Sequence, residues 1–423
     1  MLTTLPLSPE ELAAWLRLAL ARGLRPAALR ALLGAFGLPQ NILAQPFTAL
    51  AAVAGAQAAR AALAEPGPDF APQVEALRAW CAAPGNALVT LADPAYPPRL
   101  LATPDPPALL YAKGRLDLLH ARAVAVVGSR NATPQAIEDA ARFARSLAAS
   151  GLTVVSGLAQ GVDGAAHRGA LDERGGTVAV IGTGADLVYP AVHHALATQI
   201  AARGAIVSEW PLGTPARSAN FPQRNRVIAA LVEGVAVVEA AERSGSLITA
   251  RLANEMGRDV FALPGSIHAP LTRGCHGLIK QGAQLVETPE EVLDALNVGQ
   301  PAGTRQARGA QRGHPGPKVS VPFDRMPRNA SETRLRPLQS SPPLPAVARK
   351  EGISSRTGLS ADALRLLEAL GHAPATVEIL AQRTDMREAV LQGTLLQLEL
   401  AGHLDALPGG WFVRASRGQG GCQ

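Results

Sequence analysis

Residues 123–130 read Ala-Val-Ala-Val-Val-Gly-Ser-Arg, a short apolar run that ends in a glycine-containing turn. The run is apolar without alternation, which is typical of a strand buried on both faces of a parallel sheet. Five similar runs follow, separated by helical stretches: Thr153–Val155, Thr177–Ile181, Ala205–Val207, Val235–Val238 and Val260–Leu263. We therefore predict an α/β fold with a buried parallel sheet.

Each of these runs ends in a polar or glycine-rich turn. Right-handed crossovers bring the carboxyl ends of parallel strands to one edge of the sheet, where ligands bind. Gly128-Ser129-Arg130, Ser156–Gly161 and Gly182-Thr183-Gly184 are turns of this kind. Glycine permits close backbone approach, helix N-termini favour anions, and an arginine adds a bidentate phosphate contact. None of these turns matches a dinucleotide fingerprint or a P-loop, but together they predict an anion-binding rim.

Length and composition limit the class of protein. A chain of 423 residues suggests two or three domains. No apolar stretch approaches the length of a membrane span, and Met1 is not followed by a signal-type segment, so we expect a soluble, cytoplasmic protein without a membrane partner. The three cysteines are too few and too scattered for a disulfide framework or a zinc site. We expect neither a metal nor a cofactor.

The net charge of +6 is unevenly distributed. Residues 298–350 hold ten Lys or Arg and two acidic residues, a local charge of +8, so the rest of the chain carries −2. This stretch is rich in Pro, Gly, Ser and Gln and has few aliphatic residues, which predicts a disordered linker over 298–357. It is either a solvated tether or a basic arm that helps to hold DNA.

Two further domains flank the sheet domain, which we place at 86–297. Residues 1–85 have helical apolar spacing, and Ser8-Pro9 is a favourable helix start, so we expect a small helical domain of the SAM or helix-hairpin-helix type. Residues 358–416 read as three helices followed by a hairpin with Gly409-Gly410 at its tip, a winged-helix-like domain. Its second and third helices are not basic, so DNA binding and protein contact both remain open for it.

The segment 217–226 combines cations, amides and an aromatic ring just before an apolar helix. Its candidate binding residues are Arg217, Asn220, Phe221, Arg224, Asn225 and Arg226. Basic groups that follow a phosphate backbone, beside a ring on which a base can stack, are what single-stranded nucleic acid requires. Phe221 alone could equally be a core residue. With the arginines beside it, we favour binding.

The motifs of this domain, in their order, closely resemble those of the DNA-processing protein A family (DprA, also called Smf). The resemblance rests on Gly128-Ser129-Arg130, Ser156–Asp163, Tyr189-Pro190, Asn220–Arg226, Glu242–Ala250 and Pro264-Gly265. It implies an extended Rossmann-like domain that binds single-stranded DNA, homodimerisation, and loading of the RecA recombinase onto incoming strands during natural transformation. Single-strand binding protein is a further candidate partner.

The resemblance also implies roles for individual residues. Gly128, Ser129 and Arg130, with the backbone of Ser156 and Gly157, would hold phosphates. Asn220, Phe221, Arg224 and Asn225 would line the same pocket. Members often carry a basic residue where this chain has Ser218, next to Arg217, and an asparagine where this chain reads Ala191–His194.

The sequence also permits three enzymatic interpretations. Asp163 and His167 are spaced to form an acid–base pair, although Asp163 favouring a helix N-terminus and His167 on the helix surface is the simpler interpretation. Nucleotide hydrolases of the lysine-decarboxylase-like group end a related motif in a catalytic glutamate, where this chain has Thr249. A dinucleotide-dependent oxidoreductase would need an acidic residue at the end of the second strand to hold a ribose, but this chain has Ser156-Gly157 there. We therefore predict a binding protein that is not an enzyme.

Overall fold

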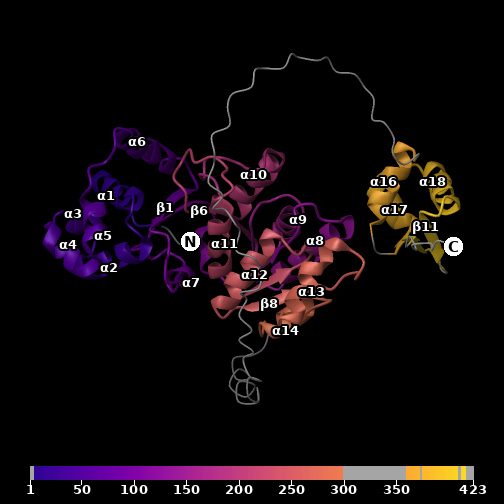
Figure 1. Ribbon diagram of the computed structural model, residues 1–423. Helices are drawn as coiled ribbons and strands as arrows, with labels where there is room; N and C mark the ends of the chain where they lie inside the picture. Colours follow the sequence, from indigo (N-terminus) through magenta and orange to yellow (C-terminus); the bar gives the residue numbers. More distant parts are fainter. Residues whose placement is uncertain (1–3, 299–358, 372–373, 408–410, 416–423) are drawn as a thin grey trace, which may run out of the picture.

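The computed structural model describes residues 4–298, 359–371, 374–407 and 411–415. A nine-stranded sheet in the order β1-β2-β6-β5-β4-β3-β7-β8-β9 forms its centre (Figure 1). All six predicted strands are present and mutually parallel, which confirms the fold class. They are β3 (Ala123–Val127), β4 (Thr153–Ser156), β5 (Thr177–Val180), β6 (Ala205–Ser208), β7 (Gly234–Val237) and β8 (Asp259–Ala262).

The sheet is larger than the sequence indicated. Residues 86–119, which contain several prolines, add two strands to the six apolar runs: β1 (Asn86–Thr90) and β2 (Leu109–Gly114). β1 pairs with β2, and β2 pairs with β6, both antiparallel, so the sheet is mixed at this edge. A short parallel strand, β9 (Gln284–Leu285), closes the other edge. The prolines lie between the strands, where they do not interrupt the ladder.

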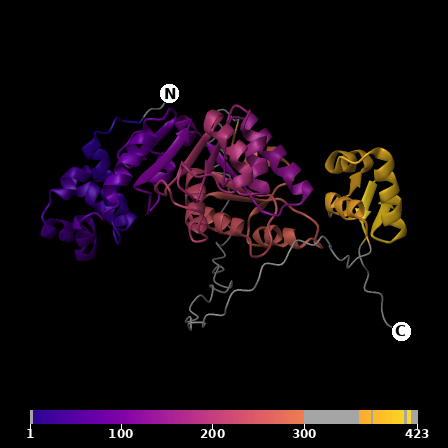
Figure 2. The same ribbon diagram turned by 90° about the horizontal axis from the view of Figure 1, so that it is seen from above.

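Helices cover both faces of the sheet (Figure 2). The α11–α13 side forms one core with Val127, Val155 and Val237, while α8, α9 and α14 pack against the side chains that alternate with these, such as Val126 and Val154. The helices are α8 (Pro134–Ala149), α9 (Val162–Ala170), α10 (His194–Arg203), α11 (Asn220–Leu231), α12 (Gly245–Glu255), α13 (Arg273–Lys280) and α14 (Pro289–Ala295). Burial on both faces explains why the strands lack alternation.

The N-terminal part is helical, as predicted. Ser8 forms a capping box with Glu11 at the start of α1, and Pro9 is the first helical residue. Trp15 of α1 packs with Leu88 and Tyr111, so this part contacts β1 and β2. The elements are α1 (Pro9–Leu20), α2 (Pro26–Phe36), α3 (Pro39–Leu43), α4 (Phe47–Ala54), α5 (Ala56–Leu63), α6 (Phe70–Cys81) and, after β1, α7 (Pro98–Leu101).

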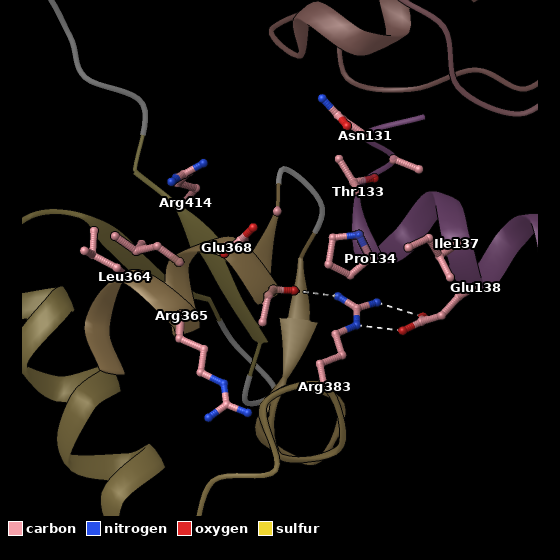
Figure 3. A pocket seen from close by; sticks show the side chains of 14 residues that line it. Asn131, Thr133, Pro134, Ile137, Glu138, Leu364, Arg365, Glu368, Arg383 and Arg414 are labelled. Atoms are coloured by element: carbon pink, nitrogen blue, oxygen red, sulfur yellow. Dashed lines mark hydrogen bonds and ion pairs between the residues drawn. The ribbon is translucent and has the colours of Figure 1, made fainter. Parts of the chain in front are cut away.

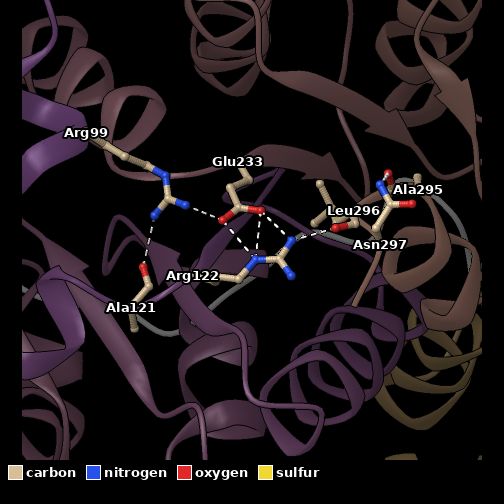
Figure 4. Close-up of polar contacts among 7 residues, drawn as sticks. All are labelled: Arg99, Ala121, Arg122, Glu233, Ala295, Leu296 and Asn297. Atoms are coloured by element: carbon tan, nitrogen blue, oxygen red, sulfur yellow. Dashed lines mark hydrogen bonds and ion pairs between the residues drawn. The ribbon is translucent and has the colours of Figure 1, made fainter. Parts of the chain in front are cut away.

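A charged junction lies at the amino ends of the central strands (Figure 4). Glu233, just before β7, accepts hydrogen bonds from both Arg99 of α7 and Arg122, which precedes β3. Arg122 also donates to the carbonyl of Leu296 at the end of α14. The Glu233 carboxylate raises the pKa of Arg122. This partly buried network joins four segments at the amino ends of the strands, opposite the predicted rim.

The C-terminal part has the predicted helices and wing. α16 (Ala361–Leu370), α17 (Val377–Thr384) and α18 (Glu388–Leu400) enclose a core, and β10 (Ala375–Thr376), β11 (Leu404–Leu407) and β12 (Trp411–Arg414) form a small antiparallel sheet. The predicted hairpin tip at Gly409-Gly410 lies outside the described residues. So does the linker predicted for 298–357, except for Val298. Among the described helices, none is long and apolar enough to cross a membrane.

Candidate functional site

A cavity of about 750 Å³ opens at the carboxyl ends of β3 and β7. From β3 the chain builds β4, β5 and β6 on one side, and then β7 and β8 on the other. The cavity therefore lies where the strand order reverses, the usual ligand position in such sheets. Turns that follow β3, β6 and β7 supply most of its lining. Of the predicted site, the residues that line it are Gly128, Ser129, Arg130, Phe221, Arg224 and Asn225.

The turn after β3 requires glycine at position 128. A Cβ there would come within 2.6 Å of Val162 Cγ2 and 2.9 Å of the Glu239 carbonyl oxygen. Val162 in turn donates its amide to the Ser129 carbonyl, which fixes the turn against α9. Within the described chain, the amides of Ser129 and Arg130 donate no hydrogen bond. Close packing thus leaves these two donors at the cavity.

Arg130 is exposed and carries its charge into the cavity. Its guanidinium carbon lies 5.1 Å from the centroid of the Phe221 ring. No carboxylate or carbonyl of the described residues accepts a hydrogen bond from its side chain. This is a cation–π contact without a counter-ion. The pair offers both a free cation and an aromatic ring to a ligand.

The first residues of the turn after β4, Ser156 and Gly157, are buried and do not line the cavity, whereas Ala159 of the same turn does. Ser156 is fully buried, and its hydroxyl donates to the Val126 carbonyl at 2.7 Å. The amide of Gly157 donates to Asp163 Oδ2 at 3.1 Å. The Ser156 hydroxyl and the Gly157 amide are therefore already engaged within the protein. Their role here is to connect β4 with α9.

Asp163 and His167 are both buried beneath this turn. Asp163 accepts hydrogen bonds from the amides of Gly157 and Ala159, and burial raises its pKa while Arg224 opposes that effect. The expectation of a surface position for His167 is wrong: its side chain is fully buried. Burial lowers its pKa to about 3, so the ring is neutral and accepts a hydrogen bond from the Leu158 amide. Asp163 is 6% exposed and reaches the cavity lining, whereas His167 does not line the cavity.

Arg224 lines the cavity, but its side chain is committed to the protein. It is only 4% exposed and donates to the carbonyls of Gly157 and Val180. A Cβ at Gly157 would lie 2.0 Å from Arg224 Nη1, so a side chain there would displace the guanidinium group. Burial lowers the pKa of Arg224 to about 10, which keeps it charged at neutral pH. Arg224 thus holds α11 against the turns after β4 and β5.

The remaining predicted residues occupy different positions. Asn220 is buried and donates to the Gly182 carbonyl, and Asn225 reaches the Gly245 carbonyl at the start of α12. Arg226 does not line the cavity, because it pairs with Glu209 and donates to the Asp105 carbonyl. Arg217 is exposed and lies outside the lining, whereas Ser218 is part of it.

Sequence reasoning missed several lining residues. Arg243 is exposed at the cavity immediately before α12, and Ser244, Gly245 and Ser246 bring the N-terminus of that helix to the same place. The sequence pattern around these residues could have indicated them, because Arg243 follows a buried strand and serine, as at position 244, often caps a helix N-terminus. Tyr189, within a quoted motif, also lines the cavity.

Two parts of the chain match known protein families. Residues 87–297 match the family described as DNA recombination-mediator protein A, and residues 353–410 match the DprA winged helix domain. Protein Smf of Escherichia coli K12 is 39% identical over 345 residues, which cover 81% of each chain. The chain belongs to the DNA recombination-mediator protein A family.

Other members of this family give the same result. The DNA processing protein DprA of Streptococcus pneumoniae is 47% identical over 204 residues, which cover 48% of this chain and 72% of that protein. The X-ray structure of the S. pneumoniae protein superposes with a TM-score of 0.57 and 35% identity, covering 69% of this chain and 98% of that one. The family confirms the resemblance that the motifs indicated.

The DprA winged helix domain contacts the sheet domain through one arginine (Figure 3). Arg383 of α17 donates to both carboxylate oxygens of Glu138 on α8, at 2.7 and 2.8 Å, and to Gln135. A second cavity, of about 690 Å³, lies beside this contact and is lined by residues of both domains, among them Asn131 and Arg414. Arg383, one of the domain's four arginines, is thereby engaged within the molecule.

Proposed function

We propose that the cavity between β3 and β7 binds single-stranded DNA. One observation carries this proposal: the uncompensated guanidinium of Arg130 lies 5.1 Å from the Phe221 ring in an open cavity. A cation for a phosphate beside a ring for a base is the combination that single-stranded nucleic acid uses. A base in a duplex has no free face, so the site favours single strands.

The arginines fall into two groups, according to their exposure and to whether the protein already accepts their hydrogen bonds. Arg130 and Arg243 contact phosphates, together with the amides of Ser129 and Arg130 and the N-terminus of α12. Arg224 and Arg226 instead position the site, because their guanidinium groups are already hydrogen-bonded to the protein. Arg217, exposed near the lining, is available to a strand that leaves the cavity.

The cellular role follows from membership of the recombination-mediator family. We infer that the protein loads RecA onto incoming single strands during natural transformation, that it acts as a homodimer in the cytoplasm, and that single-strand binding protein is a further partner. Binding rather than catalysis is favoured by Thr249, which is buried at the cavity where a hydrolase would place its glutamate. A hydroxyl cannot replace a carboxylate as general base.

The test is equilibrium binding of labelled oligonucleotides across a salt series. We expect tighter binding of single strands than of duplex at moderate salt, and affinity that falls as salt rises because bound phosphates release counterions. Arg168, exposed on α9 and outside the cavity lining, supplies a control variant, Arg168→Ala, that should bind normally. Equal affinity for duplex and single strand would contradict the proposal.

A further inference from the structure

Tyr189 exposes an aromatic ring at the same cavity, and no role has yet been assigned to it. Tyr189 is 49% exposed, a large fraction for an aromatic residue, because buried rings contribute most to packing. Its ring centroid lies 5.8 Å from that of Phe221, at an interplanar angle of 45°. Two aromatic rings from different elements thus form one continuous surface.

Phe221 itself is already in contact with several protein groups. Arg130 lies 5.1 Å and Arg224 5.9 Å from its ring centroid. Gly182 packs so closely that a Cβ there would come within 3.3 Å of Phe221 Cδ1. These neighbours leave Phe221 half-buried, whereas Tyr189 is exposed. Tyr189 is therefore the more accessible ring of the pair.

The segment that carries Tyr189 is held on both sides. Before it, Thr183 donates its hydroxyl to the Leu187 carbonyl at 3.0 Å. After it, His193 Nδ1 is hydrogen-bonded to the Leu158 carbonyl at 3.0 Å, and His193 packs so closely on α9 that a Cβ at Gly164 would lie 2.6 Å from its ring. The ring is thus presented from a fixed backbone, which lowers the entropy lost on binding.

We propose that Tyr189 stacks on a base adjacent to the one at Phe221, so that the cavity holds two bases on a two-ring platform. The inference rests on the proposed function and extends it, because it sets a minimum of two stacked nucleotides. Stacking is tolerant of sequence, since every base has a π-face. The phosphates of the same two nucleotides remain with Arg130 and Arg243.

The experiment compares Tyr189→Ala and Tyr189→Phe by oligonucleotide titration in a salt series. Tyr189→Ala should lower affinity about 5- to 150-fold, the range for one lost stacking contact, without changing the salt slope, because no phosphate contact is lost. Tyr189→Phe keeps the ring and should restore most of the affinity. Val192→Ala removes an exposed apolar side chain from the same segment, outside the cavity lining, and is the matched control.

A second readout uses oligonucleotides with a fluorescent adenine analogue at successive positions. Wild-type protein should change the fluorescence of the analogue at two adjacent positions. Tyr189→Ala should change it at only one position. Wild-type affinity of a folded Tyr189→Ala protein, combined with weakened binding by Phe221→Ala, would overturn the inference and leave the proposed function intact. A salt slope reduced as in Arg130→Ala would also overturn it. Failure of the wild-type protein to prefer single strands would instead contradict the proposed function.

Discussion

Two arginines at one cavity show how burial separates ligand contact from support. Arg130 and Arg224 both lie within 6 Å of the Phe221 ring centroid. Arg130 is exposed and has no acceptor among the described residues, whereas Arg224 is buried and bound to two carbonyls. A new phosphate contact costs Arg130 no existing hydrogen bond. Arg224 would have to leave buried carbonyls unpaired, at a cost of about 1–3 kcal/mol each.

The first residue-scale prediction concerns Arg130→Ala. It should weaken binding of single strands of any sequence by about 1–3 kcal/mol, since a charge-assisted hydrogen bond to phosphate is lost. The slope of log affinity against log salt should become shallower by about 0.7. Titration in a salt series measures both effects. A normal melting curve with unchanged affinity would show that Arg130 is a surface charge only.

The second concerns Phe221, which is half-buried and packs on Gly182. Stacking tolerates another ring, so Phe221→Tyr should bind nearly normally, while Phe221→Ala should lose about 1–3 kcal/mol of binding and keep its fold. A core role would instead cost about 3–5 kcal/mol of folding free energy on truncation. Thermal unfolding and DNA titration of both variants distinguish these outcomes. A destabilised Phe221→Ala with normal affinity would assign Phe221 to the core.

At the scale of elements, the turn between β4 and α9 is organised from beneath by two buried polar side chains. Asp163 accepts the amides of Gly157 and Ala159, and His167 accepts that of Leu158 and contacts Thr177 at 2.7 Å. Leu158 has a φ of 58°, an uncommon value for a branched residue. These bonds support a turn that a leucine would otherwise avoid, and so help to shape the cavity wall.

This arrangement predicts a pH dependence of folding. The pKa of His167 is about 3 when folded, against 6.5 for an ordinary histidine, so between these values the unfolded chain binds the extra proton. Stability is therefore complete above about pH 6.5 and falls as the pH is lowered, by up to about 1.4 kcal/mol per pH unit from this group. Asp163, whose pKa is raised, acts in the opposite direction.

Urea unfolding measured between pH 5 and 7 gives the contribution of His167 as the difference in stability between the wild type and a His167 variant. His167→Gln should be less stable at pH 7 but should show a flatter dependence on pH than the wild type. His194→Gln, which replaces an exposed histidine at the start of α10, should follow the wild-type profile. Parallel profiles for the wild type and His167→Gln would mean that folding does not lower the pKa of His167.

In the whole molecule, the excess of positive charge and the cavity lie in different parts of the chain. Residues 1–298 contain 24 basic and 24 acidic residues, so the net charge of +6 comes entirely from residues 299–423. The winged helix region, 359–415, holds four arginines and seven acidic residues, which leaves the excess of positive charge in the stretch before it. The proposed binding at the cavity therefore depends on locally placed cations rather than on the net charge of its own domain.

A chain that ends at Val298 tests this separation. It keeps the sheet, the cavity and the charged junction at Leu296, and it loses all of the net positive charge. We expect it to retain single-strand binding with a smaller salt slope, because fewer cations contact phosphates. If the shortened protein is folded but no longer binds, the basic stretch or the winged helix domain is the DNA site, and the cavity is not.

Local patterns were sufficient for part of this structure. The six parallel strands, the capped start at Ser8-Pro9 and the helices of the winged domain follow from apolar periodicity and capping chemistry, which act over a few residues. The same patterns placed Gly128-Ser129-Arg130 and Phe221 at one edge of the sheet, and both line the cavity.

The exposure of each polar group, however, depends on contacts between segments far apart in the chain. Arg224 is buried because Gly157, 67 positions earlier, has no side chain to exclude it. Tyr189 and Arg243 meet at the cavity through the order of the strands, and β1 and β2 are strands because each finds a pairing partner. A one-dimensional pattern shows which residues can bind, but long-range packing and desolvation select which of them remain free to do so.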